Sequence, residues 1–272
     1  MRALKFSRKN LGIPYALFLL AFVILPLLLI IYYAFTDSNG AFTLSNFTNF
    51  FASTTNVTVL FRSFGIAFLS TVLCLLIGYP VSYILARSGL KKSSVLLLLF
   101  ILPMWINFVL RTAAMKELLY LLGLYDNGNY HYLNTVIGMV YDYLPVTILP
   151  LYTVLSKLDK NLLEASSDLG AKPLYTFINT TLPLSMPGIA SAITMVFLPT
   201  TTSYVISDTL GNSKVTIIGK LIENKFNSGT AGSWNAGSAI ALVLLILIFI
   251  TMFVSGKFQN DDDKSARGNG LW

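Results

Sequence analysis

The sequence LGIPYALFLLAFVILPLLLIIYYAF occupies residues 11–35 and contains no charged side chain. Such a run is long enough to cross a bilayer as a helix, which takes about 20 residues. Arg2, Lys5, Arg8 and Lys9 precede it, as in a secretory signal peptide. The apolar core of a signal peptide, however, is only roughly 7–15 residues long. We therefore predict an uncleaved first transmembrane helix.

The whole chain has the composition of a protein that crosses the membrane several times. Hydrophobic residues make up 55% of its 272 residues and charged residues 11%, whereas typical soluble domains carry about 25% charged residues. This composition excludes a secreted domain and a nucleic-acid-binding protein, despite the formal net charge of +7. The single cysteine, Cys74, has no partner for an internal disulfide, and the single histidine, His131, supports no metal site.

Six apolar segments are long enough to span, near residues 11–35, 61–86, 93–115, 132–155, 186–208 and 234–256. They are continuous runs without alternation, which favours helices over a β-barrel. The predicted fold class is an all-α membrane protein with six transmembrane helices in one domain, residues 11–256. We expect each proline within these segments to kink its helix; these are Pro26, Pro80, Pro103, Pro145, Pro150 and Pro199.

Basic residues predict the orientation of the chain. With the N-terminal segment 1–10 inside, 13 lysines and arginines lie on the cytoplasmic side and six on the outer side. Both termini are then cytoplasmic, and the loop at residues 156–185 also faces the cytoplasm. The polar tail at residues 257–272 is predicted to be cytoplasmic and disordered.

The loop at residues 156–185 is long for a plain connection and has the pattern of a helical hairpin. Asp159 can cap a first helix, Gly170 suits the position after its end, and Pro173 suits the start of a second helix. The predicted apolar faces are Leu162, Leu163, Ser166 and Leu169 on the first helix, and Leu174, Phe177, Ile178 and Leu182 on the second. Taken alone, this pattern also fits an amphipathic hairpin at the membrane surface.

The same loop resembles the cytoplasmic "EAA" loop of bacterial type I ABC-importer permeases. Glu164-Ala165, Gly170 six residues after the glutamate, and the closing Leu182-Pro183 match its pattern. Ser166 replaces the second alanine and Thr180 the usual isoleucine. The resemblance implies a coupling helix at Glu164–Gly170 that enters a groove on a separate ATPase. The coupling residues that it implies are Glu164, Ala165, Asp168, Gly170 and Pro183.

Further stretches resemble the spermidine/putrescine permeases of the PotB type, among them Leu102–Trp105, Arg111-Thr112 and Tyr204–Asp208. This resemblance implies one permease subunit of a polyamine importer in the bacterial inner membrane. Its implied partners are a homologous PotC-like permease, a PotA-like ATPase dimer and an extracytoplasmic PotD-like binding protein. The sequence has no Gly-rich phosphate loop, nucleophile–base pair or metal cluster, so we expect no catalytic residue and no cofactor in this chain. ATP and Mg would bind the ATPase.

A path for polyamines needs carboxylates and aromatic faces, which attract ammonium groups. Ionisable residues within spans are functional candidates by default. The candidates in this chain are Asp208, Tyr204, Asp142, Tyr141, Tyr143, Trp105 and Asn107. Asp142 is equally suited to a structural pair with a basic residue such as Arg111, and Asp208 to a helix cap or to contact with water.

Other functions remain compatible with the sequence. One is a permease of a related importer for iron, sulfate or another small solute, and another is the sister permease of the same polyamine system. A third is an ion-coupled secondary transporter with Asp142 as its ion site, although such a transporter has no use for the loop. The helical pattern within residues 211–233 suits contact with a binding protein or a cover over the bundle.

Overall fold

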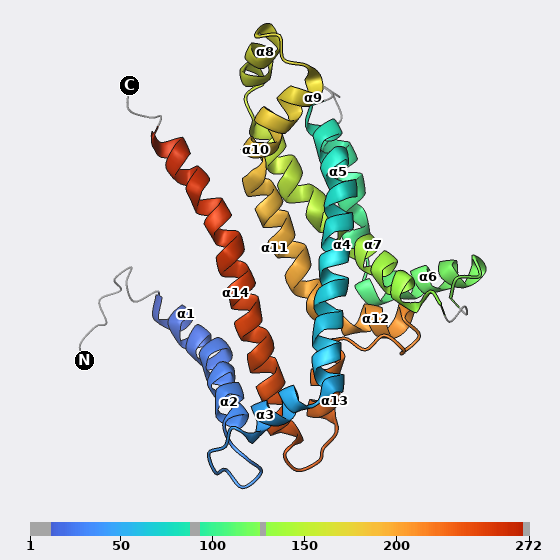
Figure 1. The fold of residues 1–272 in the computed structure, drawn as a ribbon, viewed down its shortest axis with the longest axis vertical. Coiled ribbons are helices and arrows are strands. Elements are labelled where there is room, and N and C mark those ends of the chain that lie inside the picture. Colours follow the sequence, from blue (N-terminus) through green and yellow to red (C-terminus); the bar gives the residue numbers. More distant parts are fainter. Residues whose placement is uncertain (1–11, 88–92, 126–128, 269–272) are drawn as a thin grey trace, which may run out of the picture. The chain divides into compact units, whose positions relative to one another are not determined.

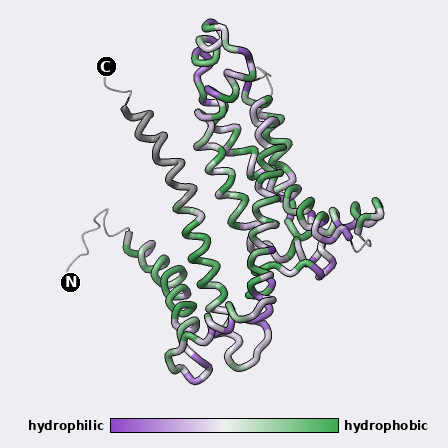
Figure 2. Tube along the Cα trace, viewed as in Figure 1, coloured by the Kyte–Doolittle hydropathy of each residue, from purple (hydrophilic) through white to green (hydrophobic). Residues whose placement is uncertain are grey.

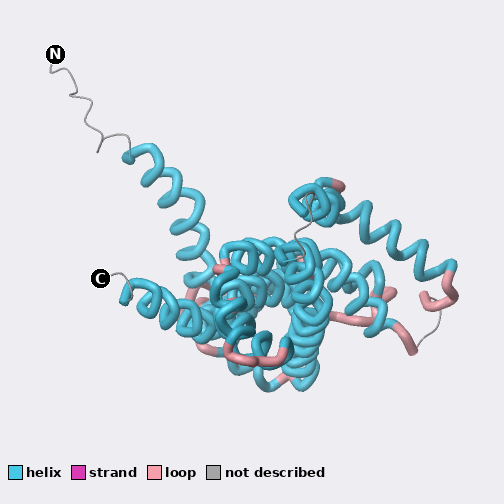
Figure 3. Tube along the Cα trace, turned by 90° about the horizontal axis from the view of Figure 1, so that it is seen from above, coloured by secondary structure: helices cyan, strands magenta, loops and turns pink. Residues whose placement is uncertain are grey.

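The computed structural model describes residues 12–87, 93–125 and 129–268, with side chains described as far as residue 253. The predicted segment 1–10 lies outside these ranges. Within them helix follows helix through short loops, and the β pairing found is an isolated antiparallel bridge between Thr36 and Phe42 (Figures 1 and 3). By length and composition four helices can cross a membrane, or up to six if each of two bent helix pairs is one span.

The four continuous candidates agree with four of the predicted spans. They are α1 to α2 (Gly12–Leu19, the π-helical turn Leu20–Ile24, and Leu25–Ala34), α4 (Thr54–Arg87), α7 (His131–Lys157) and α14 (Ser233–Gly268). Pro80, Pro145 and Pro150 lie inside continuous helices. Apolar residues run along the helices and polar residues gather near helix ends (Figure 2).

The predicted disorder of the polar tail is wrong for residues 257–268, because α14 continues as far as Gly268. Adding residues to an existing helix is much easier than nucleating a new one. The tail has no proline before that point, so a polar composition alone does not end the helix.

The third predicted span, residues 93–115, is not one straight helix. It consists of α5 (Ser93–Ile101), a 3-10 turn at Leu102–Trp105 and α6 (Phe108–Leu121), with a bend of 94°. Pro103 lies at the start of the 3-10 turn and has no N–H to donate. Asn107 then caps α6, because its side-chain oxygen accepts the N–H of Val109 at 2.9 Å.

The fifth predicted span, residues 186–208, is also interrupted. Helix α11 (Met186–Thr202) contains Pro199, and the break comes four residues later at Ser203, before α12 (Tyr204–Leu210). Three threonine hydroxyls before the break donate to carbonyls of their own helix: Thr200 to Val196 (2.7 Å), Thr201 to Phe197 (2.7 Å) and Thr202 to Pro199 (3.2 Å). The carbonyl of Pro199 belongs to the last turn of α11, where no helical N–H follows to bond it, so the Thr202 hydroxyl satisfies it.

The chain divides into two compact units, and the first comprises residues 1–57 and 221–247. It contains α3 (Ser45–Ala52) and the first part of α14. The buried side-chain amide of Asn235 donates to the carbonyl of Thr36 at 2.8 Å, and that of Asn46 donates to the same carbonyl at 2.9 Å. Two asparagines distant in sequence thus satisfy one loop carbonyl that lies outside any helix.

The second unit comprises residues 58–220 and 248–272, and α7 is packed against several of its helices. Close approaches occur at glycines, as is usual between membrane helices. A Cβ on Gly78 of α4 would stand 3.0 Å from the Thr147 side chain of α7. A Cβ on Gly188 of α11 would stand 3.1 Å from Val154. The hairpin of α8 (Lys160–Asp168) and α9 (Pro173–Thr176) lies at one end of α7, and α6 and α12 lie at the other (Figure 1).

The predicted helix within residues 211–233 is confirmed as α13 (Ile218–Asn227). Its first residue is fully buried, and the backbone N–H of Ile218 donates to the hydroxyl of Ser63 on α4 at 2.7 Å. The next residue, Gly219, lies so near the end of α11 that a Cβ would overlap the backbone carbonyl of Thr202. The start of α13 therefore packs against α4 and α11.

We predict that Gly219→Ala destabilises the protein, because its methyl group would force α13 away from Thr202. The expected cost is roughly 1–3 kcal/mol, as for other overpacked positions. The matched control is Gly65→Ala in α4, where a Cβ would meet no atom within 4 Å. Thermal unfolding of both variants in detergent checks this, and an equal midpoint for the two would contradict the close approach.

Candidate functional site

The loop at residues 156–185 forms the predicted hairpin. Helix α8 (Lys160–Asp168) begins where the carboxylate of Asp159 accepts the N–H of Asn161 at 3.0 Å. The turn then passes through Gly170 at φ +80°, a conformation that favours glycine. Pro173 begins α9 (Pro173–Thr176). All three sequence predictions for this turn are confirmed.

The predicted apolar faces of the hairpin are only partly right. On α8, Leu163 and Ser166 are half-buried, whereas Leu162 and Leu169 are exposed. On the second helix, Phe177 and Leu182 are half-buried and Leu174 and Ile178 are exposed, while Thr176 and Thr181 are buried. On the second helix, a π-helical turn over Phe177–Thr181 changes the spacing of side chains on one face.

The residues implied in coupling lie on the surface of this hairpin. Glu164, Ala165 and Asp168 are exposed on α8, and Gly170 is exposed at the turn. Pro183 is exposed on a different helix, α10 (Leu182–Leu184). A shallow groove of about 440 Å³ is lined by Ser166, Leu169, Gly170, Ala171, Lys172 and Tyr175.

The two helices of the hairpin are joined by a side-chain hydrogen bond, and the hairpin also exposes apolar side chains. The hydroxyls of Ser166 and Thr176 are hydrogen-bonded at 2.9 Å and join α8 to α9. Leu169, at the end of α8, is 89% exposed. Exposed apolar surface with a polar rim is typical of an interaction site, so the hairpin suits docking to another protein better than chemistry.

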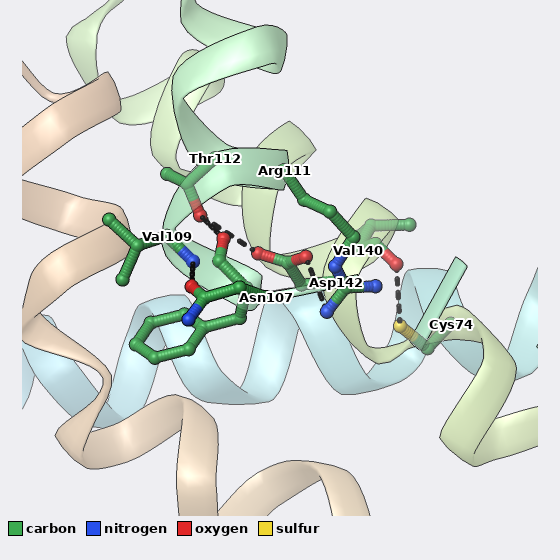
Figure 4. Close-up of polar contacts among 8 residues, drawn as sticks. Cys74, Asn107, Val109, Arg111, Thr112, Val140 and Asp142 are labelled. Atoms are coloured by element: carbon green, nitrogen blue, oxygen red, sulfur yellow. Dashed lines mark hydrogen bonds and ion pairs between the residues drawn. The ribbon is translucent and has the colours of Figure 1, made fainter. Parts of the chain in front are cut away.

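A second candidate site surrounds Asp142 within α7. The guanidinium of Arg111 on α6 is 3.0 Å from its carboxylate, and the hydroxyl of Thr112 donates to it at 3.3 Å (Figure 4). Arg111 and Asp142 are 8% and 5% exposed. The structural pair that the sequence offered as an alternative is therefore present. It fastens α6, the helix after the 94° bend, to α7.

A cavity of about 240 Å³ adjoins this pair. It is lined by Met104, Phe108, Arg111, Asp142, Tyr143, Val146, Ser203 and Ile206. Two guanidinium nitrogens of Arg111, Nε and Nη1, are buried without a hydrogen-bond partner among the described residues. Tyr141 points its ring toward Arg111 at 6.0 Å from the guanidinium carbon. The cavity is therefore polar at one side and apolar elsewhere.

A third cluster surrounds Asp208 on α12. The ammonium of Lys220 on α13 is 3.3 Å from its carboxylate and 5.4 Å from the ring centre of Tyr204. Both charged side chains are partly exposed, at 26% for Lys220 and 36% for Asp208. Asp208 is thus an ion-pair partner, which neither sequence alternative had named.

The structure does not bring all the predicted path residues together. Asp142 and Tyr143 share the cavity, whereas Tyr204 and Asp208 meet at Lys220. Trp105 is 81% exposed in the 3-10 turn, and Asn107 is the cap of α6.

Lys220 was missed from the sequence because it stands 12 residues from Asp208. The sequence indicates only that Lys220 has the opposite charge to Asp208 and lies on the same predicted side of the membrane. The pairing depends on the fold of the intervening segment, which returns α13 to α12.

Together these features define a multi-pass helical membrane protein with an exposed hairpin and polar clusters near broken helices. Residues 78–260 match the family model described as binding-protein-dependent transport system inner membrane component. The chain belongs to this family. The family assignment does not favour the secondary-transporter alternative.

Curated relatives align over most of the chain. One is the spermidine/putrescine transport system permease protein PotB of Haemophilus influenzae, 34% identical over 92% of this chain and 93% of its own. Another is PotB of Escherichia coli K12, 35% identical over 87% of this chain and 92% of its own.

Solved structures share the fold. A chain of a bacterial alginate ABC transporter, crystallised with an alginate-bound periplasmic protein, superposes with a TM-score of 0.73 at 13% identity. That match covers 91% of each chain. A chain of the MetNI methionine ABC transporter matches with a TM-score of 0.55 at 18% identity, over 75% of this chain and 94% of that one. These similarities support the type I importer-permease fold.

We predict that Arg111→Met destabilises the protein more than the double variant Arg111→Met/Asp142→Asn. The single change leaves Asp142 buried without its counter-ion, which costs roughly 3–5 kcal/mol. Thermal unfolding in detergent measures the difference. Lys116→Met on the same helix, which loses only a cation–π contact with Tyr125, serves as control. A double variant that unfolds at the same temperature as Arg111→Met, or at a lower one, would contradict a coupled pair.

Proposed function

We propose that this chain is the transmembrane permease subunit of an ATP-driven importer of polyamines such as spermidine and putrescine. The observation that carries the proposal is the alignment with PotB proteins of two bacteria over 87% or more of the chain. The exposed hairpin of α8 and α9 supports it, because such a permease needs a surface for its ATPase.

In this proposal the chain performs no chemistry. ATP and Mg bind a separate PotA-like ATPase dimer, and no cofactor binds here. A PotC-like permease supplies the other half of the path, and a PotD-like protein delivers the substrate outside. The chain lies in the bacterial inner membrane with both termini in the cytoplasm, an orientation supported by the distribution of its basic residues.

The coupling surface is the exposed side of the hairpin. Glu164 is available to pair with a basic residue of the ATPase, with Ala165 and Asp168 on the same helix and Pro183 on α10 of the same loop. Gly170 permits the tight turn that presents Leu169. The apolar side chain of Leu169 would be buried in the ATPase groove, where anchor residues contribute most to binding.

The substrate path uses the two acidic clusters. At Asp208, Lys220 places an ammonium at the end of four methylenes against a carboxylate and the Tyr204 ring. One end of putrescine has the same chemistry, so the cluster suits an alkylammonium. Asp142 is likewise occupied by Arg111. The proposal is that substrate ammonium groups compete with these two internal cations, with Tyr141, Tyr143, Trp105 and Asn107 contributing to the same path.

The test is purification of the tagged chain from its native membrane and mass spectrometry of the associated chains. A polyamine-dependent ATPase assay with the binding protein follows. We expect an ATPase, a second permease and hydrolysis stimulated by polyamine. Purification of an isolated chain without an ATPase, or stimulation by another solute instead, would overturn the proposal.

We predict that Glu164→Lys and Gly170→Arg abolish coupling but not membrane insertion. Charge reversal and backbone strain at the docking surface should weaken ATPase association roughly tenfold or more, as at hot-spot positions. The measurements are co-purification of the ATPase and polyamine uptake.

Matched controls are Glu117→Lys, at an exposed glutamate of α6, and Gly123→Arg, at a glycine of φ +67° with open space around it. Both should keep association and uptake. Wild-type association and uptake in the Glu164 and Gly170 variants would refute the coupling role.

We also predict that Asp208→Asn lowers polyamine uptake by about two- to fivefold, the range expected for a partly exposed ion contact. Asp142→Asn should lower it as well. Uptake of labelled spermidine into vesicles measures both, and Glu117→Gln makes the same charge change away from the path. Unchanged affinity and rate in both variants would remove these carboxylates from the path.

A further inference from the structure

The hairpin joins the membrane bundle at a sharp corner, which we call the elbow (Leu184–Met186). Residues Pro173–Leu184 and helix α11 meet there at a bend of 63°. Ser185, at its centre, is fully buried. Its backbone N–H donates to the carbonyl of Thr181 at 3.0 Å, and its carbonyl accepts the N–H of Gly188 at 3.0 Å. The elbow thus keeps its backbone hydrogen bonds while the chain turns.

A side-chain contact holds the elbow to α4. The hydroxyl of Tyr79 is 2.8 Å from the hydroxyl of Ser185. The Ser185 hydroxyl donates to the carbonyl of Leu182 at 2.9 Å. Because a serine hydroxyl has one proton, Tyr79 is the donor in the first bond. The two bonds form a chain from α4 to the last turn of the hairpin.

The ring of Phe177 makes a second contact between the hairpin and α4. It stands edge-on to Tyr79 and to Tyr83, each at 5.7 Å between ring centres, an arrangement that aromatic pairs prefer. Leu151 and Leu155 of α7 are buried in the same cluster. Phe177 is the first residue of the π-helical turn, and Ser185 is the last residue of the loop at residues 156–185. Helix α4 therefore contacts both ends of the segment Phe177–Ser185.

These contacts coincide with weak points in both elements. Pro80 follows Tyr79 inside α4 and removes one backbone hydrogen bond from that helix. The π-helical turn at Phe177–Thr181 and the elbow are the corresponding irregularities on the hairpin side. The contacts therefore join the hairpin to α4 next to Pro80, where α4 lacks one backbone hydrogen bond.

We infer that the Tyr79–Ser185 contact transmits motion of the hairpin to α4, which makes Tyr79 a positioning residue for coupling. The inference rests on the proposed function, since it assumes that a bound ATPase moves the hairpin. It adds to that function a specific pair of side chains, neither of which lies on the docking surface. Loss of the contact should leave the ATPase bound and active but lower the substrate moved per ATP.

The experiment uses the intact transporter, reconstituted in vesicles with its binding protein. Tyr79→Phe removes one hydroxyl and keeps the ring against Phe177, and Ser185→Ala removes the acceptor. The readouts are ATPase association, ATP hydrolysis and polyamine transported per ATP. A buried hydrogen bond is worth enough to change an equilibrium by roughly two- to tenfold, and we expect transport per ATP to fall in that range in both variants.

Two comparisons separate a coupling role from a packing role. Tyr83→Phe keeps the second ring against Phe177 and removes a hydroxyl outside the Tyr79–Ser185 contact, so it should match wild type. The double variant Tyr79→Phe/Ser185→Ala should fall no further than Ser185→Ala alone, because that single variant already removes the Tyr79–Ser185 bond together with the bond to Leu182. Normal transport per ATP in both single variants, or additive losses in the double variant, would overturn the inference.

The two hypotheses fail in different ways. If the proposed function is wrong, the unmodified chain itself will bring down no ATPase and show no polyamine-stimulated hydrolysis. If only the inference is wrong, the unmodified transporter will work and Tyr79→Phe will work equally well. A variant that loses ATPase association would also count against the inference, because the contact would then support docking and not transmission.

Discussion

The hydrocarbon core of the membrane offers no hydrogen-bond partner to a backbone group, and the rest of this structure depends on that constraint. It makes every described span helical, and it also governs where helices are interrupted. Each of these interruptions is compensated locally: Asn107 caps the helix after the 94° bend, and the Thr202 hydroxyl donates to the carbonyl of Pro199 ahead of the break at Ser203. Ser185 keeps its backbone bonds at the elbow. Irregular backbone therefore appears where side chains can support it.

The same constraint explains the placement of charge. Asp142 lies inside a span and is paired with Arg111, because an unpaired charge there would be too costly. Asp208, which is partly exposed, pairs with Lys220. Each pair also connects two helices that the sequence separates, α6 with α7 and α12 with α13. If these carboxylates line the proposed substrate path, a cationic substrate that displaces either internal cation would change a contact between two helices.

The proposed coupling role requires a polar element that is exposed outside the helix bundle and is also attached to the bundle by packed side chains. The hairpin has exposed residues on α8 and a base held by Phe177, Tyr79 and Ser185. In the proposed function, exposure lets the ATPase bind, and attachment lets its motion reach α4.

The sequence by itself determined much of this protein. Long apolar runs established the positions of four continuous spans, and Asp159, Gly170 and Pro173 predicted the hairpin turn, because helix caps and positive-φ turns depend on neighbouring residues only. Proline marked one break and missed the other: Pro103 begins the 3-10 turn of the third predicted span, whereas Pro199 stays within α11 and the chain breaks at Ser203. The π-helical turn at Phe177–Thr181 likewise shifted the buried face away from the predicted one. Only the tertiary structure decided the pairs Arg111–Asp142, Asp208–Lys220 and Tyr79–Ser185, since each joins residues on different helices whose approach is set by the packing of the whole bundle.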